Sequence, residues 1–131
     1  MLKENNTVVI ETAVKILPQL WEAVVYFQSE QCLHSLKRPR RVVYRRVFTN
    51  VKIIRTLIRP KPIVADKEPE YEMHYSVRLK GIGSHSMRWD RVTDPRSIDA
   101  QIWVYCLEWM MKWLRDRTIT EDVPIQPTIE M

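Results

Sequence analysis

The chain of 131 residues is 45% hydrophobic and carries a formal net charge of +5 at pH 7, which suits one folded domain and excludes a wholly disordered chain. The first six residues are largely polar and no stretch of about 18 apolar residues occurs, so we expect neither a signal peptide nor a membrane span. Cys32 and Cys106 lie far apart without a CxxC pair, which indicates an intracellular protein, cytoplasmic or nuclear.

The first two predicted elements are a strand and a helix. Residues 7–16 place an apolar or β-branched side chain at every second position, which favours a strand. A helix over the same residues is the alternative. Pro18 suits the first turn of a helix, and from residue 19 to residue 36 the apolar side chains fall on one broad side of a helix. Pro39 follows closely, where a helix would have to end.

The middle of the chain, residues 41–59, is dense in β-branched side chains, whose crowding at Cβ favours strands. Thr49 and Asn50 could turn the chain into a hairpin. One bent strand through the whole stretch is an alternative, and so is a helix. In either strand form, alternation places several arginines on a solvent face and the valines against the helices.

Two further strands are predicted after a loop at residues 60–69, which contains three prolines. Residues 71–80 alternate apolar and polar side chains without a break, so one face of this strand is buried and the other is in water. Gly81 and Gly83 permit a turn, and residues 85–92 return as the paired strand.

The last predicted helix begins at Asp94 and Pro95, a capping carboxylate followed by a proline in the first turn. It extends to about residue 117 and carries two adjacent apolar stripes, more than a helix on one side of a sheet needs. Either the first helix or a second copy of the protein must cover the surplus. We favour a homodimer through residues 95–117.

Together these elements predict an α+β fold, with an antiparallel sheet of about four to five strands packed against two helices at about 19–36 and 95–117. Residues 1–117 form this single domain. Residues 118–131 contain two prolines and no periodicity, so we expect an extended, flexible C-terminal tail.

The strongest functional signal is a run of ten lysines and arginines between Glu30 and Asp66, with no acidic residue among them. Like charges at this density repel one another unless an anion lies nearby, and guanidinium groups match phosphate oxygens. We therefore predict a non-enzymatic nucleic-acid-binding protein whose phosphate contacts are mainly sequence-independent. The contacts predicted from this run are Lys37, Arg38, Arg40, Arg41, Arg45, Arg46, Lys52, Arg55 and Arg59.

Other candidates lie outside the run or are aromatic. Basic side chains of the two later strands extend the basic surface if those strands adjoin the first two, and aromatic rings could stack on the bases of a single strand. DNA and RNA, single- and double-stranded, are equally open. These further candidates are Arg78, Lys80, Arg88, Arg91, Tyr44 and Trp89.

The basic and titratable residues also allow interpretations other than nucleic-acid binding. The basic face could instead meet an acidic protein or a membrane surface, as in a small structural or assembly protein, for instance a viral one. Lys37–Arg41 resembles a nuclear-localisation cluster. Glu72 and His74 could form an acid–base pair, although a solvated sheet face accounts for them. The histidines and cysteines match no compact zinc site, and we predict no metal, no cofactor and no catalytic residue.

Overall fold

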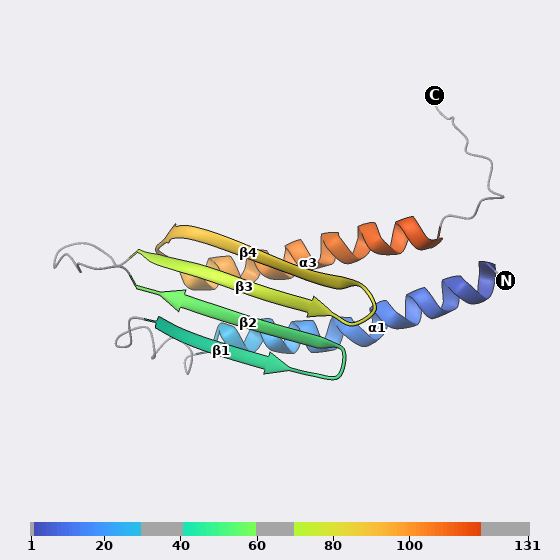
Figure 1. The fold of residues 1–131 in the computed structure, drawn as a ribbon, viewed down its shortest axis with the longest axis horizontal. Coiled ribbons are helices and arrows are strands. Elements are labelled where there is room, and N and C mark those ends of the chain that lie inside the picture. The colour runs from blue at the N-terminus through green and yellow to red at the C-terminus, as the bar shows by residue number, and fades with distance from the viewer. Residues whose placement is uncertain (1, 30–40, 60–69, 119–131) are drawn as a thin grey trace, which may run out of the picture.

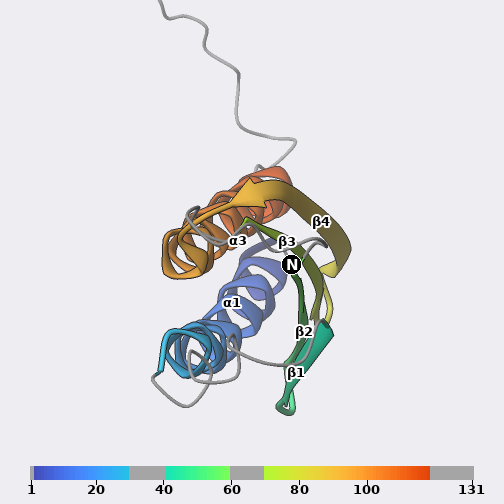
Figure 2. The same ribbon diagram turned by 90° about the vertical axis from the view of Figure 1, so that its left-hand side faces the viewer.

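The structure is a computed structural model, which describes residues 2–29, 41–59 and 70–118. Four strands form one antiparallel sheet in the order β1-β2-β3-β4, and both described helices lie on one face of it (Figure 1 and Figure 2). The predicted α+β fold is confirmed. The elements are α1 (Leu2–Phe27), β1 (Arg41–Val47), β2 (Val51–Ile58), β3 (Tyr71–Leu79), β4 (Gly83–Val92) and α3 (Pro95–Thr118).

The strand predicted at residues 7–16 is wrong, because α1 includes these residues and contains Pro18 in its interior. Ala13, Ile16 and Leu20 are buried at spacings of three and four, the period of a helix. Most of the alternating apolar side chains that suggested a strand are exposed. Over ten residues, the two-residue period of a strand and the 3.6-residue period of a helix place apolar side chains at several of the same positions. Packing against the sheet selected the helix.

The predicted helix over 19–36 is the second half of α1, which ends at Phe27. Residues 30–36 lie outside the part of the chain that the structure describes. The helix predicted at 95–117 is confirmed as α3 and ends one residue later. Neither helix, over its described length, is long and apolar enough to cross a membrane.

α1 and α3 run side by side in opposite directions (Figure 1), and side chains of the two helices pack against each other. Trp21 meets Trp103 edge to face, with ring centroids 5.0 Å apart. Further along, the Gln28 amide donates a hydrogen bond of 2.9 Å to the Arg96 carbonyl. The first helix therefore covers some of the surplus apolar surface that we predicted for residues 95–117.

The hairpin alternative for residues 41–59 is confirmed, since β1 and β2 pair antiparallel around a turn at residues 48–50. β3 buries every second side chain, as predicted, and β4 returns beside it. In the turn between them Gly81 has a φ of +84°, a conformation that a residue without Cβ adopts at no steric cost. The core lies between the inner face of this sheet and the two helices.

One irregularity interrupts the β3–β4 ladder near Tyr71, at the end away from the turn that joins the two strands. Tyr71 pairs with Val92 and Met73 pairs with Trp89, so β4 contains one extra residue between these two pairs. Such an extra residue is a β-bulge. Arg91 lies in it with a φ of 56°, a left-handed conformation that is uncommon for a residue with a side chain.

Candidate nucleic-acid interface

The sheet has an inner face, which packs on the helices, and an outer face, which is turned away from them (Figure 2). Side chains alternate between the two faces along each strand, and β2 shows this most clearly, with buried positions 51, 53, 55 and 57. The ladder register then assigns every residue of the neighbouring strands to a face. The cations of the outer face are Arg41, Arg45, Lys52, Arg78 and Arg88, with Lys80 directly after β3.

Three of these cations, Lys52, Arg78 and Lys80, form what we call the basic end of the outer face. Lys52 and Arg78 are direct partners in the β2–β3 ladder, and Lys80 follows Arg78 by two positions on the same face. All three are exposed. No carboxylate among the described residues forms an ion pair with any of them.

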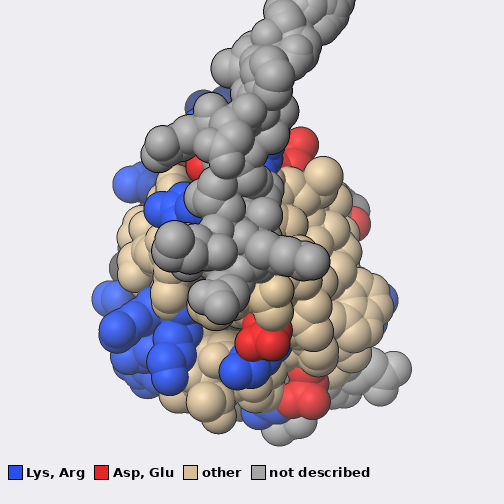
Figure 3. All heavy atoms as spheres, turned by 90° about the vertical axis from the view of Figure 1, so that its right-hand side faces the viewer, with Lys and Arg blue, Asp and Glu red and all other residues tan. Residues whose placement is uncertain are grey.

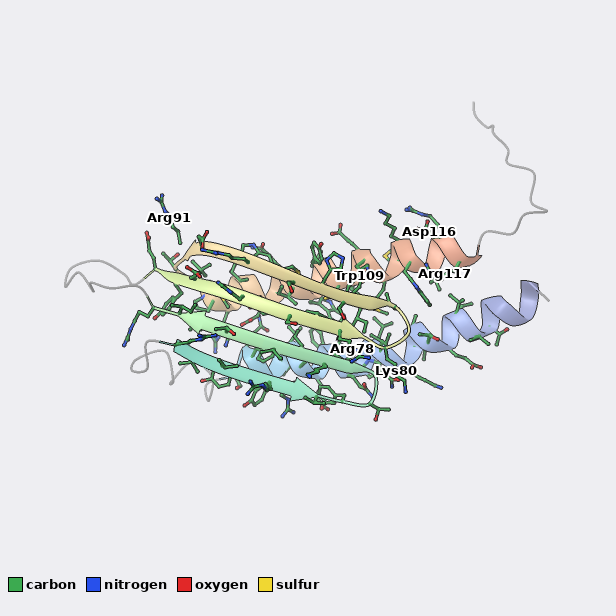
Figure 4. The ribbon with its side chains drawn as sticks, in the orientation of Figure 1. Arg78, Lys80, Arg91, Trp109, Asp116 and Arg117 are labelled. Atoms are coloured by element: carbon green, nitrogen blue, oxygen red, sulfur yellow. The ribbon has the colours of Figure 1, made fainter. Side chains whose placement is uncertain are left out.

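The basic end lies where the β1–β2 and β3–β4 turns meet. Figure 4 shows Arg78 and Lys80 together at this end of β3, with Arg91 at the opposite end of the molecule. Figure 3, which faces the same end, shows a group of Lys and Arg side chains on one flank with acidic side chains only outside that group. The three cations line a depression of about 260 Å³ together with residues 47–51.

The opposite end of the outer face contains its own counter-charges. Arg88 lies 3.3 Å from a carboxylate oxygen of Glu72 and 3.1 Å from one of Asp90. His74 Nε2 is 2.6 Å from the other oxygen of Glu72, so the pair that we weighed as an acid and a base is formed. Arg88 therefore offers less uncompensated charge to a phosphate than Lys52 or Arg78.

Arg55 cannot serve as the phosphate contact that we predicted, because its side chain is fully buried on the inner face. Its Nη2 donates a hydrogen bond of 2.9 Å to Asp99 Oδ2, and the Tyr75 hydroxyl donates to the other carboxylate oxygen. The aromatic rings of Phe27 and Tyr44 lie 5.5 and 5.9 Å from the guanidinium carbon. Nε and Nη1 of Arg55 are buried without a hydrogen-bond partner.

Burial shifts the pKa values of the groups around Arg55. It raises the pKa of Asp99, which the Arg55 charge and the hydrogen bonds offset only in part. It also raises the pKa of Tyr75 far above its ordinary value, and the neighbouring Asp99 adds to this rise. Arg55, Asp99 and Tyr75 thus form a compact polar group inside the core, inaccessible to a nucleic acid.

Two predicted aromatic contacts and one predicted arginine also lie on the inner side. Tyr44 packs against Tyr26, and Trp89 meets Tyr75 edge to face at 5.7 Å between ring centroids. Arg46 is half-buried, with its guanidinium 4.3 Å from the centre of the Tyr26 ring. These side chains do not share a face with the basic end, so we no longer expect them to stack on bases.

The remaining predicted residues have mixed positions. Arg59 follows β2, where its charge partly opposes the burial that raises the pKa of Tyr71. Arg91 is exposed in the bulge of β4. Lys37, Arg38 and Arg40, with most of the predicted nuclear-localisation cluster, lie outside the residues that the structure describes.

Asp99 was not predicted from the sequence and Arg55 was predicted on the wrong face, although the sequence pattern contains a signal for both. Arg55 occupies the same alternation as Ile53 and Leu57, and Asp99 stands beside Ile98 on the apolar side of its helix. Both charged residues occupy positions that the strand or helix period places among buried apolar residues. Two opposite charges at such positions are typical of a buried ion pair.

The cysteine and histidine side chains add no further site to the described part of the chain. There, no three His, Cys, Asp or Glu side chains gather as metal ligands would. Cys106 is buried, and burial raises the pKa of its thiol to about 12, which keeps it in the unreactive protonated form.

Comparison with known proteins adds no family to this description. The chain matches no protein-family model, no curated protein and no solved structure. Its function must therefore be inferred from its own residues.

Proposed function

We propose that this protein binds nucleic acid through the outer face of its sheet, by contacts to backbone phosphates. The observation that supports this most is the basic end. Lys52 and Arg78 stand directly opposite each other across two strands, an arrangement of like charges that destabilises a sheet. A phosphate bound between them would relieve that repulsion, and the charged hydrogen bonds it accepts are among the stronger ones in proteins.

The rest of the outer face extends the same surface along the strands. Arg41 and Arg45 lie on β1 and are exposed, with no ion pair to a described carboxylate. Val43 and Ile54 separate the cations, and the contacting surface is a sheet without a projecting helix. Such a surface suits phosphate contacts and not the reading of base edges in a groove. Binding is therefore largely independent of sequence.

The test is fluorescence anisotropy with labelled single- and double-stranded DNA and RNA over a series of salt concentrations. Affinity should fall steeply with salt, because each neutralised phosphate releases counterions. Replacing Lys52, Arg78 and Lys80 together by alanine should reduce the slope of log K against log salt by about 1 for each lost contact.

Arg88→Ala is the matched control for this test, since Glu72 and Asp90 already neutralise that arginine. Its salt slope should stay close to that of the unaltered protein. The proposal fails if no nucleic acid binds in low salt, or if the triple variant and the control behave alike.

We also propose that the helical side of the molecule forms a homodimer, which leaves both outer faces accessible. Exposed apolar side chains continue from one helix to the other, with Val14 58%, Trp21 52%, Val104 53% and Met111 67% exposed. The contact between Trp21 and Trp103 joins the two helices within this surface. Apolar surfaces of this kind commonly mark contact sites between proteins, and a two-fold axis would pair the surface with itself.

Light scattering at several protein concentrations tests the dimer. Met111→Lys should shift the protein to the monomer while its circular dichroism stays unchanged, because Met111 lies outside the core. Lys112→Ala, a change at the neighbouring exposed position on the same helix, should leave the mass unchanged. A monomer at all concentrations contradicts the dimer.

Capture of an acidic protein or of anionic vesicles by the basic end, without nucleic-acid binding, would favour the assembly role over the first proposal.

The cellular location remains a prediction from the sequence. A cytoplasmic or nuclear protein agrees with a nucleic-acid partner, and Lys37–Arg41 is the segment to alter if nuclear import is tested.

A further inference from the structure

We infer that the basic end is a binding site for a phosphate monoester dianion, and that its occupant is the terminal phosphate of a nucleic-acid strand lying on the outer face. This inference rests on the proposed nucleic-acid binding. It goes further by naming the chemical group that the depression beside Lys52, Arg78 and Lys80 recognises.

The density of positive charge at the basic end matches a dianion better than a single negative charge. Lys52 and Arg78 are ladder partners, so their Cβ atoms are about 5 Å apart, and Lys80 lies about 7 Å further along the strand. An internal phosphodiester carries a single negative charge, which one cation neutralises. A terminal monoester carries about −1.5 to −2 at pH 7, a better match for three cations gathered at one place.

The far end of β1 differs from the basic end in its density of charge. Arg41 pairs across the ladder with Ile58, an uncharged residue. It therefore presents a single cation, which suits one internal phosphodiester. The outer face thus offers isolated positive charge along β1 and concentrated positive charge at the basic end.

The shape and rigidity of the basic end also suit a bound anion. The depression of about 260 Å³ is lined by the β1–β2 turn as well as by the three cations, and Thr49 and Asn50 add neutral hydrogen-bonding side chains to the lining. The turn is held in place from two sides. The Asn50 N–H donates to Gln19 Oε1 of α1 at 2.8 Å, and the Lys80 N–H donates to the Asn50 carbonyl at 2.9 Å. A site fixed in this way loses less conformational entropy when it binds an anion.

The experiment compares one fluorescently labelled single strand of about ten nucleotides with a 5′-phosphate, with a 3′-phosphate, and with hydroxyl groups at both ends. The label is attached to an internal base, and anisotropy is measured at 0.15 M salt, where non-specific backbone binding is weak. The strand whose phosphate is at the recognised end, either 5′ or 3′, should bind at least about tenfold more tightly than the hydroxyl strand. This difference is expected for new hydrogen bonds to charged groups.

Variants and pH assign this preference to the basic end. Lys52→Ala and Arg78→Ala should each reduce the preference for the phosphorylated strand, whereas Arg41→Ala should weaken all three strands equally and leave their ratio unchanged. The preference should also decline below about pH 6, where the monoester takes up a proton. All these side chains are exposed, and thermal unfolding would show that each variant remains folded.

The outcomes separate this inference from the proposed function. Equal binding of all three strands overturns the terminal-phosphate site and leaves nucleic-acid binding intact. Failure of every strand to bind, even in low salt, overturns both. A phosphoserine peptide that binds with the same dependence on Lys52 and Arg78, while the phosphorylated strands do not bind, would overturn nucleic acid as the occupant.

Discussion

Strands β2 and β3 carry charged side chains on both faces of the sheet. The charge on the inner face is neutralised within the protein, whereas the charge on the outer face has no partner among the described residues. On the inner face Arg55 of β2 pairs across the ladder with Tyr75 of β3, and Asp99 supplies a carboxylate at 2.9 Å. On the outer face, three residues away along each strand, Lys52 pairs with Arg78. No described residue supplies a counter-charge there.

The difference follows from the medium around each cluster. A buried guanidinium has lost its hydration, so the fold must provide an anion and hydrogen-bond acceptors or become much less stable. Exposed cations keep their water and are screened by salt, so a sheet tolerates them without a partner. Unpaired charge on the outer face therefore remains available to a ligand, whereas the charge of Arg55 is already used.

The largest expected effect comes from removing the buried counter-charge. Asp99→Ala leaves Arg55 buried and unpaired, and should lower the free energy of unfolding by about 3–5 kcal/mol. Urea unfolding followed by circular dichroism measures this change.

Asp90→Ala is the control for Asp99→Ala, because Asp90 pairs with Arg88 in water and its loss should change stability by less than about 0.5 kcal/mol. The triple variant Arg55→Met, Tyr75→Phe and Asp99→Leu should recover much of the stability lost in Asp99→Ala, because it leaves no member of the buried polar group without its partner and apolar residues often replace a buried ion pair at little cost. Equal effects of Asp99→Ala and Asp90→Ala would contradict this account of the two faces.

The next largest effect is expected at alkaline pH, where the buried thiol of Cys106 should make the stability of the fold depend on pH. Burial raises the pKa of Cys106 from 9.0 to about 12, so between these values the unfolded chain has released a proton that the folded chain keeps. Stability should therefore be unaffected by this thiol below about pH 8.5 and should fall as pH rises beyond it. The loss at pH 10 amounts to about 1 kcal/mol for this group.

Urea unfolding at pH 7, 9 and 10 checks this effect, with Cys106→Ala as the comparison. The variant should lose less stability than the unaltered protein over the same pH range, while Tyr75 contributes a decline of the same sign to both. In a Cys32→Ser variant, which keeps Cys106 as its single thiol, a thiol reagent at pH 8 should label the protein only as fast as it opens. Immediate labelling would show that Cys106 is not buried.

The smallest effect on stability is expected at the basic end, and it should have the opposite sign from the effect on binding. Lys52→Glu places a carboxylate directly opposite Arg78, so repulsion across the strands becomes attraction and stability should rise by about 0.2–1 kcal/mol. Nucleic-acid affinity should fall more than in Lys52→Ala. Thermal unfolding and anisotropy of the same sample measure both quantities, and a loss of stability together with unchanged affinity would be incompatible with an anion site.

Much of the fold could be predicted wherever one pattern had no competitor. The alternation in β3 admits only a strand, and Asp94 with Pro95 marks the start of α3 within a residue. The stretch 7–16 was mispredicted because strand and helix periods both fit its short apolar pattern. The contact of Ala13 and Ile16 with the sheet decided between them, and that contact involves residues distant in sequence.

What the sequence by itself determined is the amount of positive charge in the middle of the chain, its lack of local acidic partners and the strand-forming character of β1 and β2. Only the tertiary structure decided which cations are available. Arg45 and Arg46 are neighbours in sequence but lie on opposite faces of the sheet, because successive side chains of a strand point in opposite directions. Asp99 reaches Arg55 from 44 residues away, and Arg78 reaches Lys52 through a ladder register that neither segment specifies alone. Neutralisation depends on distance in space, so residue order could not reveal it.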